Sequence, residues 1–183
     1  MNRVRQAILP GVLISCLGLW IFTRLFSVSL PLSQDGQKYA FPEPSSCSLA
    51  SAYPPDIQQW CPLIQAYAAK YDIDPNLVAA VMLQESGGNP KAYSHSGAVG
   101  LLQVMPRDGI AANFMCKNGP CFANRPGMEE LFDPQFNIEY GVRLLANLIQ
   151  KKGSLRDGLK AYGPMDVGYR YADIVLNIYE NYQ

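Results

Sequence analysis

The sequence lacks any excess of charge of one sign, and this absence excludes several classes of function. Its 15 Lys and Arg residues balance 15 Asp and Glu residues, and no basic or acidic block interrupts the chain. Proteins that hold nucleic acid or an anionic membrane surface by charge carry a basic patch. We therefore expect no nucleic-acid partner, and a substrate that is recognised through short-range contacts.

Histidine is nearly absent as well, because His95 is the only one. The cysteine spacing does not match a zinc site, so we expect neither a metal ion nor a cofactor. Four cysteines lie beyond the N-terminal segment and allow three pairings. The Asn-Gly-Pro turn between Cys116 and Cys121 could join these two thiols and leave Cys47 for Cys61. Free thiols are the alternative.

Strand signals are scarce, and apolar residues recur at helical spacing over most of the chain. Asp-Pro pairs predict helix starts and glycines predict helix ends. We predict a mainly α domain over 56–183, with at most a small β-hairpin near 91–96 or around 116–121. The expected helices begin at Pro62, cover 75–86, run from Asp133 to Gly153, run from Ser154 to Tyr162, and cover 166–180.

The segment 1–32 differs from the rest in its hydrophobicity. Two arginines precede an apolar stretch over 7–22, which is followed by Arg24. This pattern predicts an N-terminal hydrophobic helix that is either an uncleaved membrane anchor or a cleaved secretory signal, and lipidation of Cys16 is a third alternative. All three place the protein in the cell envelope, outside the cytoplasm, membrane-anchored or secreted. Residues 33–55 are rich in Ser and Pro, so we expect a linker there.

One carboxylate, Glu85, ends an apolar run and directly precedes Ser86 and two glycines. Leu77, Val81 and Glu85 are spaced i, i+4 and i+8, so Glu85 continues an apolar stripe of the predicted helix. Burial on this stripe and the negative end of the helix dipole both favour the neutral form of the carboxyl. A general acid at neutral pH needs this property. The alternative is a solvated glutamate before a glycine cap.

Three motifs around this glutamate occur in a particular order. They are ESGGNPKAYSHSGAVG from Glu85, GLLQVMP over 100–106, and AYG over 161–163 before a tyrosine-rich final helix. Over roughly residues 60–180 the sequence resembles the lysozyme-like soluble-type lytic transglycosylase (SLT domain) family, which is related to goose-type lysozymes. The resemblance implies a lysozyme-like helical fold. It also implies cleavage of the β-1,4 bond between N-acetylmuramic acid and N-acetylglucosamine in peptidoglycan glycan strands.

In that family the glutamate of the Glu-Ser motif protonates the leaving oxygen, and Glu85 holds this position. It then acts as the base toward the muramyl 6-hydroxyl, which closes a 1,6-anhydro ring. No second carboxylate stands out, since Asp133 and Asp74 fit helix caps and Asp72 a turn. Hydrolysis by the same acid, as in a lysozyme-type muramidase, stays open. An inactive glycan-binding or envelope-assembly module is a third alternative.

Further matches to the family's motifs imply substrate-binding residues. Gln103 corresponds to an amide that lines the sugar cleft, and Tyr162 to a tyrosine whose hydroxyl lies near the catalytic carboxyl. The remaining matches are Ser86, Ser94 and Met105. One departure concerns the residue after the motif tyrosine, where the family commonly has Asn and this chain has Gly163. We expect activity to survive this change and subsite preference to differ. We expect no catalytic role for His95.

Overall fold

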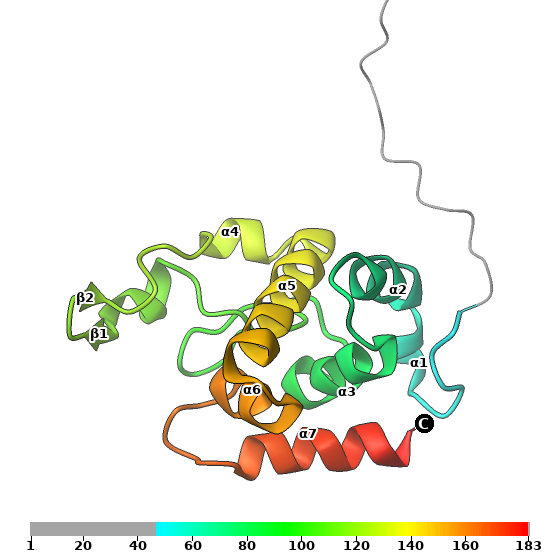
Figure 1. Ribbon diagram of the computed structural model, residues 1–183. Helices are drawn as coiled ribbons and strands as arrows, with labels where there is room; N and C mark the ends of the chain where they lie inside the picture. Colours follow the sequence, from blue (N-terminus) through cyan, green and yellow to red (C-terminus); the bar gives the residue numbers. More distant parts are fainter. Residues whose placement is uncertain (1–46, 183) are drawn as a thin grey trace, which may run out of the picture. The chain divides into compact units, whose positions relative to one another are not determined.

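A computed structural model describes residues 47–182, which form a mainly helical domain (Figure 1). The prediction of a mainly α fold with a small hairpin is confirmed. The hairpin lies at 115–120, whereas Tyr93 forms only an isolated bridge with Val99. The elements are α1 (Pro55–Gln58), α2 (Cys61–Lys70), α3 (Pro75–Ser86), the 3-10 helix η1 (Gly109–Asn113), β1 (Met115–Cys116), β2 (Gly119–Pro120), α4 (Met128–Leu131), α5 (Pro134–Lys152), α6 (Leu155–Tyr162) and α7 (Arg170–Asn181).

Local capping explains where the longer helices begin. The side chains of Asp74, Asp133 and Ser154 accept hydrogen bonds from backbone N–H groups in the first turns of α3, α5 and α6. The final helix begins at Arg170, four residues later than predicted, because the chain turns first. Gly168 takes a left-handed conformation, with φ of +61°, and helices rarely continue through such a residue.

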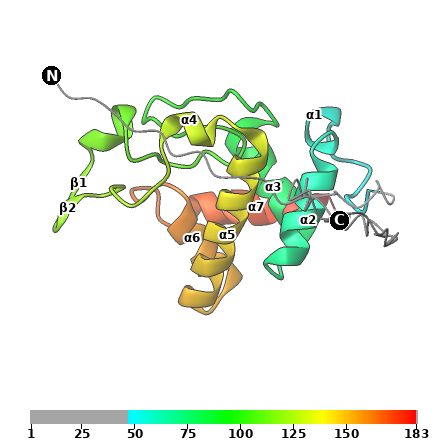
Figure 2. The ribbon, with the colours of Figure 1, turned by 90° about the horizontal axis from the view of Figure 1, so that it is seen from above.

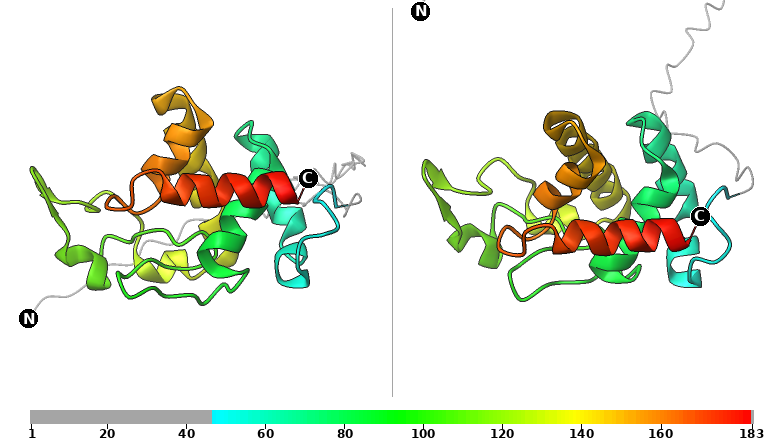
Figure 3. Two further views of the ribbon diagram at one scale, coloured as in Figure 1. Left: turned by 90° about the horizontal axis from the view of Figure 1, so that it is seen from below. Right: turned by 60° about the horizontal axis from the view of Figure 1, so that its bottom comes forward.

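The central helix is α3, which contacts α1, α2 and α7. Figures 2 and 3 show α7 lying beside α3, with α6 next to the start of α7. The six consecutive residues 77–82 are all buried. A helix that is apolar on all sides lies in the core. Glu85 follows this buried stretch, in the last turn of α3, where the side chains are partly exposed.

A loop over 88–108 connects α3 to η1, and a buried side chain holds it on α5. The Asn137 amide accepts a hydrogen bond from the Leu102 N–H at 2.8 Å and donates to the Val99 carbonyl at 2.9 Å. It also donates to the Leu131 carbonyl at 2.8 Å. Gly100 passes so close to this amide that a Cβ there would lie 2.7 Å from the Leu131 oxygen. These contacts fix the segment that carries Gln103.

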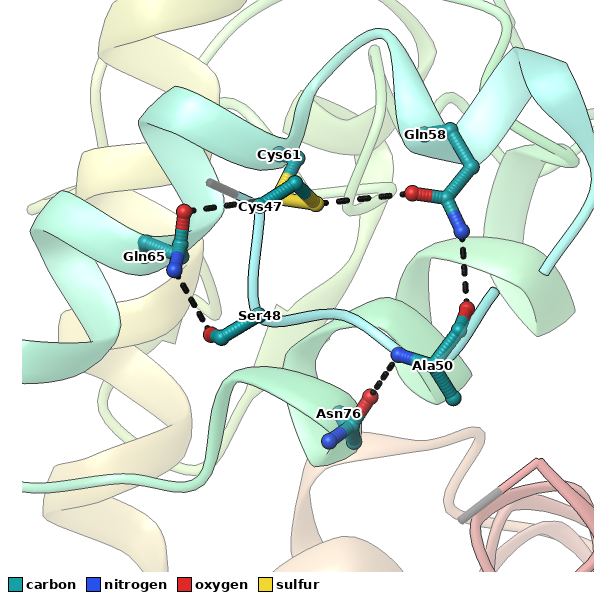
Figure 4. The surroundings of a disulfide bond; sticks show 7 residues. All are labelled: Cys47, Ser48, Ala50, Gln58, Cys61, Gln65 and Asn76. Carbon is teal, nitrogen blue, oxygen red and sulfur yellow. Dashed lines mark hydrogen bonds between the residues drawn. A yellow bond between two sulfur atoms is a disulfide. The ribbon is translucent and has the colours of Figure 1, made fainter. Parts of the chain in front are cut away.

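Residues 47–54 pack against the domain, in contrast to the linker that their Ser and Pro content predicts. Tyr53 is 2% exposed and donates to the Asn76 carbonyl at 2.9 Å. Figure 4 shows the Cys47–Cys61 disulfide beside hydrogen bonds that join Ala50 to Gln58 and Asn76. The domain thus includes residues before 56, because these side chains supply core contacts and a covalent link.

The two disulfides that the turn between Cys116 and Cys121 suggested are both formed. Cys47 is joined to Cys61, and Cys116 is joined to Cys121, which closes the hairpin with a Cα–Cα distance of 5.0 Å. Within 47–182 no helix combines the length and the apolar character that crossing a bilayer requires. The predicted hydrophobic helix over 1–32, with Cys16, lies outside the described residues, and so does the linker over 33–46.

Candidate active site

Glu85 lies in the last turn of α3 and is half-buried. Its Oε1 accepts a hydrogen bond from the Tyr171 hydroxyl. Burial raises the pKa of Glu85 to about 7, while the hydrogen bond from Tyr171 acts in the opposite direction. Val81 and Leu77, one and two turns earlier, are buried. The burial of this stripe and the upward direction of the pKa shift agree with the expectation from the sequence.

The second oxygen of Glu85 has no protein partner among the described residues. Among the described residues, no hydrogen bond to Oε2 is formed, and no buried side-chain oxygen or nitrogen lacks a partner. Oε2 must therefore touch solvent. Glu85 thus has one oxygen bound by Tyr171 and one that no described residue binds.

Tyr171 is the residue that sequence reasoning missed, because its spacing indicated only the apolar face of the last helix. It lies at the start of α7, is 6% exposed, and donates its hydroxyl proton to Glu85. Burial, followed by the nearby charge of Glu85, raises the pKa of Tyr171, so it stays a donor. A buried tyrosine hydroxyl needs a polar partner, and this was the available signal.

Tyr162, at the end of α6, stacks beside Tyr171 with ring centroids 6.5 Å apart. Its hydroxyl donates to the Leu102 carbonyl at 2.7 Å, rather than to Glu85. Burial raises its pKa well above the usual value, and the charge of Glu85 adds to this effect. Through this hydrogen bond Tyr162 ties α6 to the 88–108 loop.

The predicted serines use their hydroxyls within the protein. Ser86 donates to the Leu101 carbonyl at 2.8 Å and accepts from the Gly88 N–H at 3.2 Å. Ser94 accepts from the Ala98 N–H at 2.9 Å. These three bonds shape the loop after α3. The structure thus gives these two serines a supporting role in the loop, and Ser86 directly follows Glu85 in the chain.

Gln103 keeps one polar atom available. Its Nε2 donates to the carbonyls of Gly100 at 2.9 Å and Ala92 at 3.2 Å. Among the described residues, no hydrogen bond to its Oε1 is formed, so this oxygen can accept one from a ligand. Gln103 has a positive φ of 44°, which is uncommon for glutamine. Met105 is half-buried and lies outside the core cluster.

The other carboxyls with shifted pKa values differ from Glu85 in direction. The pKa of Glu139, Asp157 and Asp173 is lowered, chiefly by hydrogen bonds from Lys70, Ser154 and Arg156 respectively. Asp133 and Asp74 serve as helix caps, as predicted. Within 47–182 no group of three or more His, Cys, Asp or Glu residues is placed to hold a metal ion.

His95 lies on the surface. It lines a hollow of about 300 Å³ together with Ser96, Ile110, Asn113 and Phe114. None of the residues around Glu85 lines this hollow.

The fold and the site define a helical domain in which the carboxyl of Glu85 has a pKa near neutral pH. A family model, the transglycosylase SLT domain, matches residues 62–166. The chain belongs to this family. The match begins at the start of α2 and includes Glu85, Gln103 and Tyr162, whereas Tyr171 lies beyond it.

Two curated relatives are similar over part of their length. Membrane-bound lytic murein transglycosylase E of Buchnera aphidicola is 35% identical over 101 residues, which are 55% of this chain and 44% of the relative. The transglycosylase of Enterobacteria phage PRD1 is 36% identical over 104 residues, or 57% and 34%. The chain therefore spans less than half the length of these two relatives.

A solved structure shares the fold. An inactive mutant of the lytic transglycosylase Slt from Pseudomonas aeruginosa superposes with a TM-score of 0.50 at 23% identity. The match covers 66% of this chain and 23% of that one. At this identity the likeness concerns the fold alone, and it agrees with the lysozyme-like helical architecture expected from the sequence.

Proposed function

We propose that the protein is a peptidoglycan lytic transglycosylase that cleaves the β-1,4 bond between N-acetylmuramic acid and N-acetylglucosamine. The observation that carries the proposal is Glu85, a carboxyl with a pKa of about 7 and one oxygen that no described residue binds. Family membership supports it, and so do the names of the relatives. The fit extends to Gln103 and Tyr162, which follow the family's motifs.

The pKa suits a group that must both give and take a proton. At pH 7 about half of the molecules carry a protonated Glu85, because the pH equals its pKa. In the first step Glu85 transfers its proton to the bridging oxygen, and the bond from that oxygen to the muramyl C1 breaks. The resulting carboxylate keeps its hydrogen bond from Tyr171, which stabilises the charged form.

In the second step the same carboxylate acts as the base. It removes the proton from the muramyl 6-hydroxyl, whose oxygen then bonds to C1 and closes the 1,6-anhydro ring. The proton returns to Glu85, so that no water is consumed. Between the two steps C1 carries positive charge. The substrate's own N-acetyl oxygen supplies the electrons that stabilise C1, which removes the need for a second carboxylate.

The neighbouring residues have binding roles in this scheme. Oε1 of Gln103 accepts a hydrogen bond from a sugar hydroxyl or N–H group, while its Nε2 stays bound to the loop. The stacked rings of Tyr162 and Tyr171 form one wall beside the acid. Ser86 and Ser94 hold the loop that faces the sugar, and Met105 adds an apolar contact.

We further propose that the segment 1–32 exports or anchors the domain, because its substrate lies outside the cytoplasm. The names of several relatives, such as membrane-bound lytic murein transglycosylase E, support an envelope location. Fractionation of cells that express the full chain, with and without residues 1–32, tests this proposal. Activity of the shortened protein only in the cytoplasmic fraction is the expected result.

Mass spectrometry of digested peptidoglycan tests the reaction itself. Products that end in 1,6-anhydromuramic acid support the proposal, whereas reducing muramic acid ends show hydrolysis, as by a muramidase. The Glu85→Gln variant is digested in parallel, because glutamine keeps the shape of the side chain and cannot donate the proton. Turnover by the wild-type chain that persists unchanged in this variant would exclude the mechanism. Binding to peptidoglycan without any products would indicate an inactive binding module.

A further inference from the structure

The ring of Tyr171 lies directly against the backbone of Gly163, the residue that follows α6. A Cβ added to Gly163 would lie 2.9 Å from Cβ of Tyr171 and closer still to its Cγ and Cδ1. Carbon atoms in van der Waals contact are about 3.5–4.0 Å apart, so no side chain fits here. Gly163 has φ of −72°, which other residues readily adopt. The glycine is therefore required for space and not for backbone conformation.

Tyr171 cannot move out of this space without losing packing contacts and a hydrogen bond. The overlapping atoms are at the root of its side chain, so a rotation of the distal ring does not clear them. The ring is buried, stacks on Tyr162, and has its hydroxyl bonded to Glu85. Any residue with a Cβ at 163 must move Tyr171, and this movement separates the hydroxyl from Oε1 of Glu85.

We propose that Gly163 is a positioning residue for the general acid. Because it has no side chain, the Tyr171 ring can pack on the turn after α6, and this packing sets the hydrogen bond from Tyr171 to Glu85. The family commonly has an asparagine at this motif position. In this chain the place where that side chain would begin is filled by Tyr171, so the tyrosine hydroxyl, and not an amide at 163, contacts the acid. This inference rests on the proposed function of Glu85.

Gly163→Ala in the full chain tests the inference by the pH dependence of peptidoglycan turnover. The hydrogen bond from Tyr171 lowers the pKa of Glu85, so its loss shifts the alkaline limb of the profile upward, by about one pH unit. We expect kcat to fall about 10-fold, since the acid is less well held, with little change in KM. An unchanged profile and rate would overturn the inference.

Gly168→Ala is the matched control, because it adds the same methyl group to the same connection between α6 and α7. No heavy atom lies within 4 Å of a Cβ at Gly168. Its positive φ makes alanine unfavourable there, so the control also measures the effect of a generally destabilised loop. We expect Gly168→Ala to lower the melting temperature and to leave the pH profile in place. A shift equal to that of Gly163→Ala would contradict the inference.

A double-mutant cycle with Tyr171 separates this inference from the proposed function. In the Tyr171→Gly background both the obstructing ring and the Cβ that carries it are gone, so Gly163→Ala should no longer lower the melting temperature, whereas it lowers that of the wild-type chain by several degrees. Equal losses in both backgrounds would show that Tyr171 is not the obstacle. The cycle needs no catalysis. Turnover that survives Glu85→Gln would refute the proposed function and leave this coupling intact.

Discussion

Two glutamates of this protein each accept a hydrogen bond from a tyrosine hydroxyl, yet their acidities move in opposite directions. Glu85, at the end of α3, is bonded to Tyr171 and has a raised pKa. Glu139, on α5, is bonded to Tyr71 at 3.3 Å and has a lowered pKa. The tyrosine therefore does not decide which form of the carboxyl is favoured.

The two glutamates differ in their exposure to solvent and in the presence of a neighbouring cation. Lys70 donates to Glu139 at 2.6 Å, and both side chains are partly exposed, 54% and 33%. This lysine is the main cause of the lowered pKa of Glu139. The causes of the shift at Glu85 are burial and the Tyr171 bond, and neither is a cation. Burial next to a neutral donor yields an acid that holds a proton near neutral pH, and exposure next to lysine yields a carboxyl that is an anion at neutral pH.

Replacing each glutamate by glutamine should give the largest contrast. Glu85→Gln removes the only proton donor in the proposed mechanism, and we expect turnover of peptidoglycan to fall by about 10²–10⁴-fold. Glu139→Gln is the matched control on the same domain and should retain turnover within about twofold. Release of soluble fragments from purified peptidoglycan measures both. Equal losses in the two variants would contradict the comparison.

The contributions of the two glutamates to the free energy of unfolding should change with pH in opposite directions. The pKa of Glu85 is about 7 in the folded protein against an ordinary value of 4.5 for glutamate, so the folded state binds more protons between these values. The free energy of unfolding then falls as the pH rises from about 4.5 to 7, by about 3 kcal/mol in total from this group. Glu139, with a lowered pKa, contributes stability that is lost as the pH falls through its folded pKa.

Urea unfolding at pH 5 and pH 8 measures the contribution of Glu85. The wild-type chain should lose more stability between these pH values than Glu85→Gln does, because glutamine does not titrate. Glu85→Gln should also be the more stable of the two at pH 8, where it avoids a buried charge. Identical slopes for the two proteins would show that the pKa of Glu85 is not raised in the folded state.

Removing the tyrosine hydroxyl that each glutamate binds should have a smaller effect than replacing the glutamate. Tyr171→Phe keeps the ring and removes the donor, so the pKa of Glu85 should rise by about one unit, and the alkaline limb of turnover should move with it. Tyr71→Phe removes the corresponding donor from Glu139 and should leave the profile unchanged. The pH dependence of kcat, measured for both variants, checks this. A downward shift in Tyr171→Phe would mean that water enters the site.

Local features of the site could be predicted from the sequence. Asp74, Pro75 and Gly87 define the ends of α3 in the structure as they did in the sequence, because capping depends on neighbouring residues. The position of Glu85 on an apolar stripe follows from the same helix. Its raised pKa could therefore be anticipated before any tertiary contact was known.

The partners of the acid could not be predicted in this way. Tyr171 lies 86 positions from Glu85 in the chain, and helical periodicity shows only that it faces the core. The contact exists because α7 packs on α3 and because Gly163 leaves room for the ring. The packing of residues 47–54 was missed for a similar reason, since the Tyr53 ring stacks on Tyr182, at the other end of the domain.

The smallest effect should come from the ion pair of Glu139 itself. Because both partners are partly exposed, solvent screens the pair, and Glu139→Gln should lower the melting temperature at pH 7 by less than about 2 °C. The loss should disappear in 1 M salt, where the Debye length is about 3 Å. It should also disappear at a pH below the folded pKa of Glu139, because the wild-type carboxyl is then neutral as well. Thermal unfolding under these three conditions measures it. A large loss that persists in high salt would mean that Glu139 is held by more than Lys70, and that exposure alone does not distinguish it from Glu85.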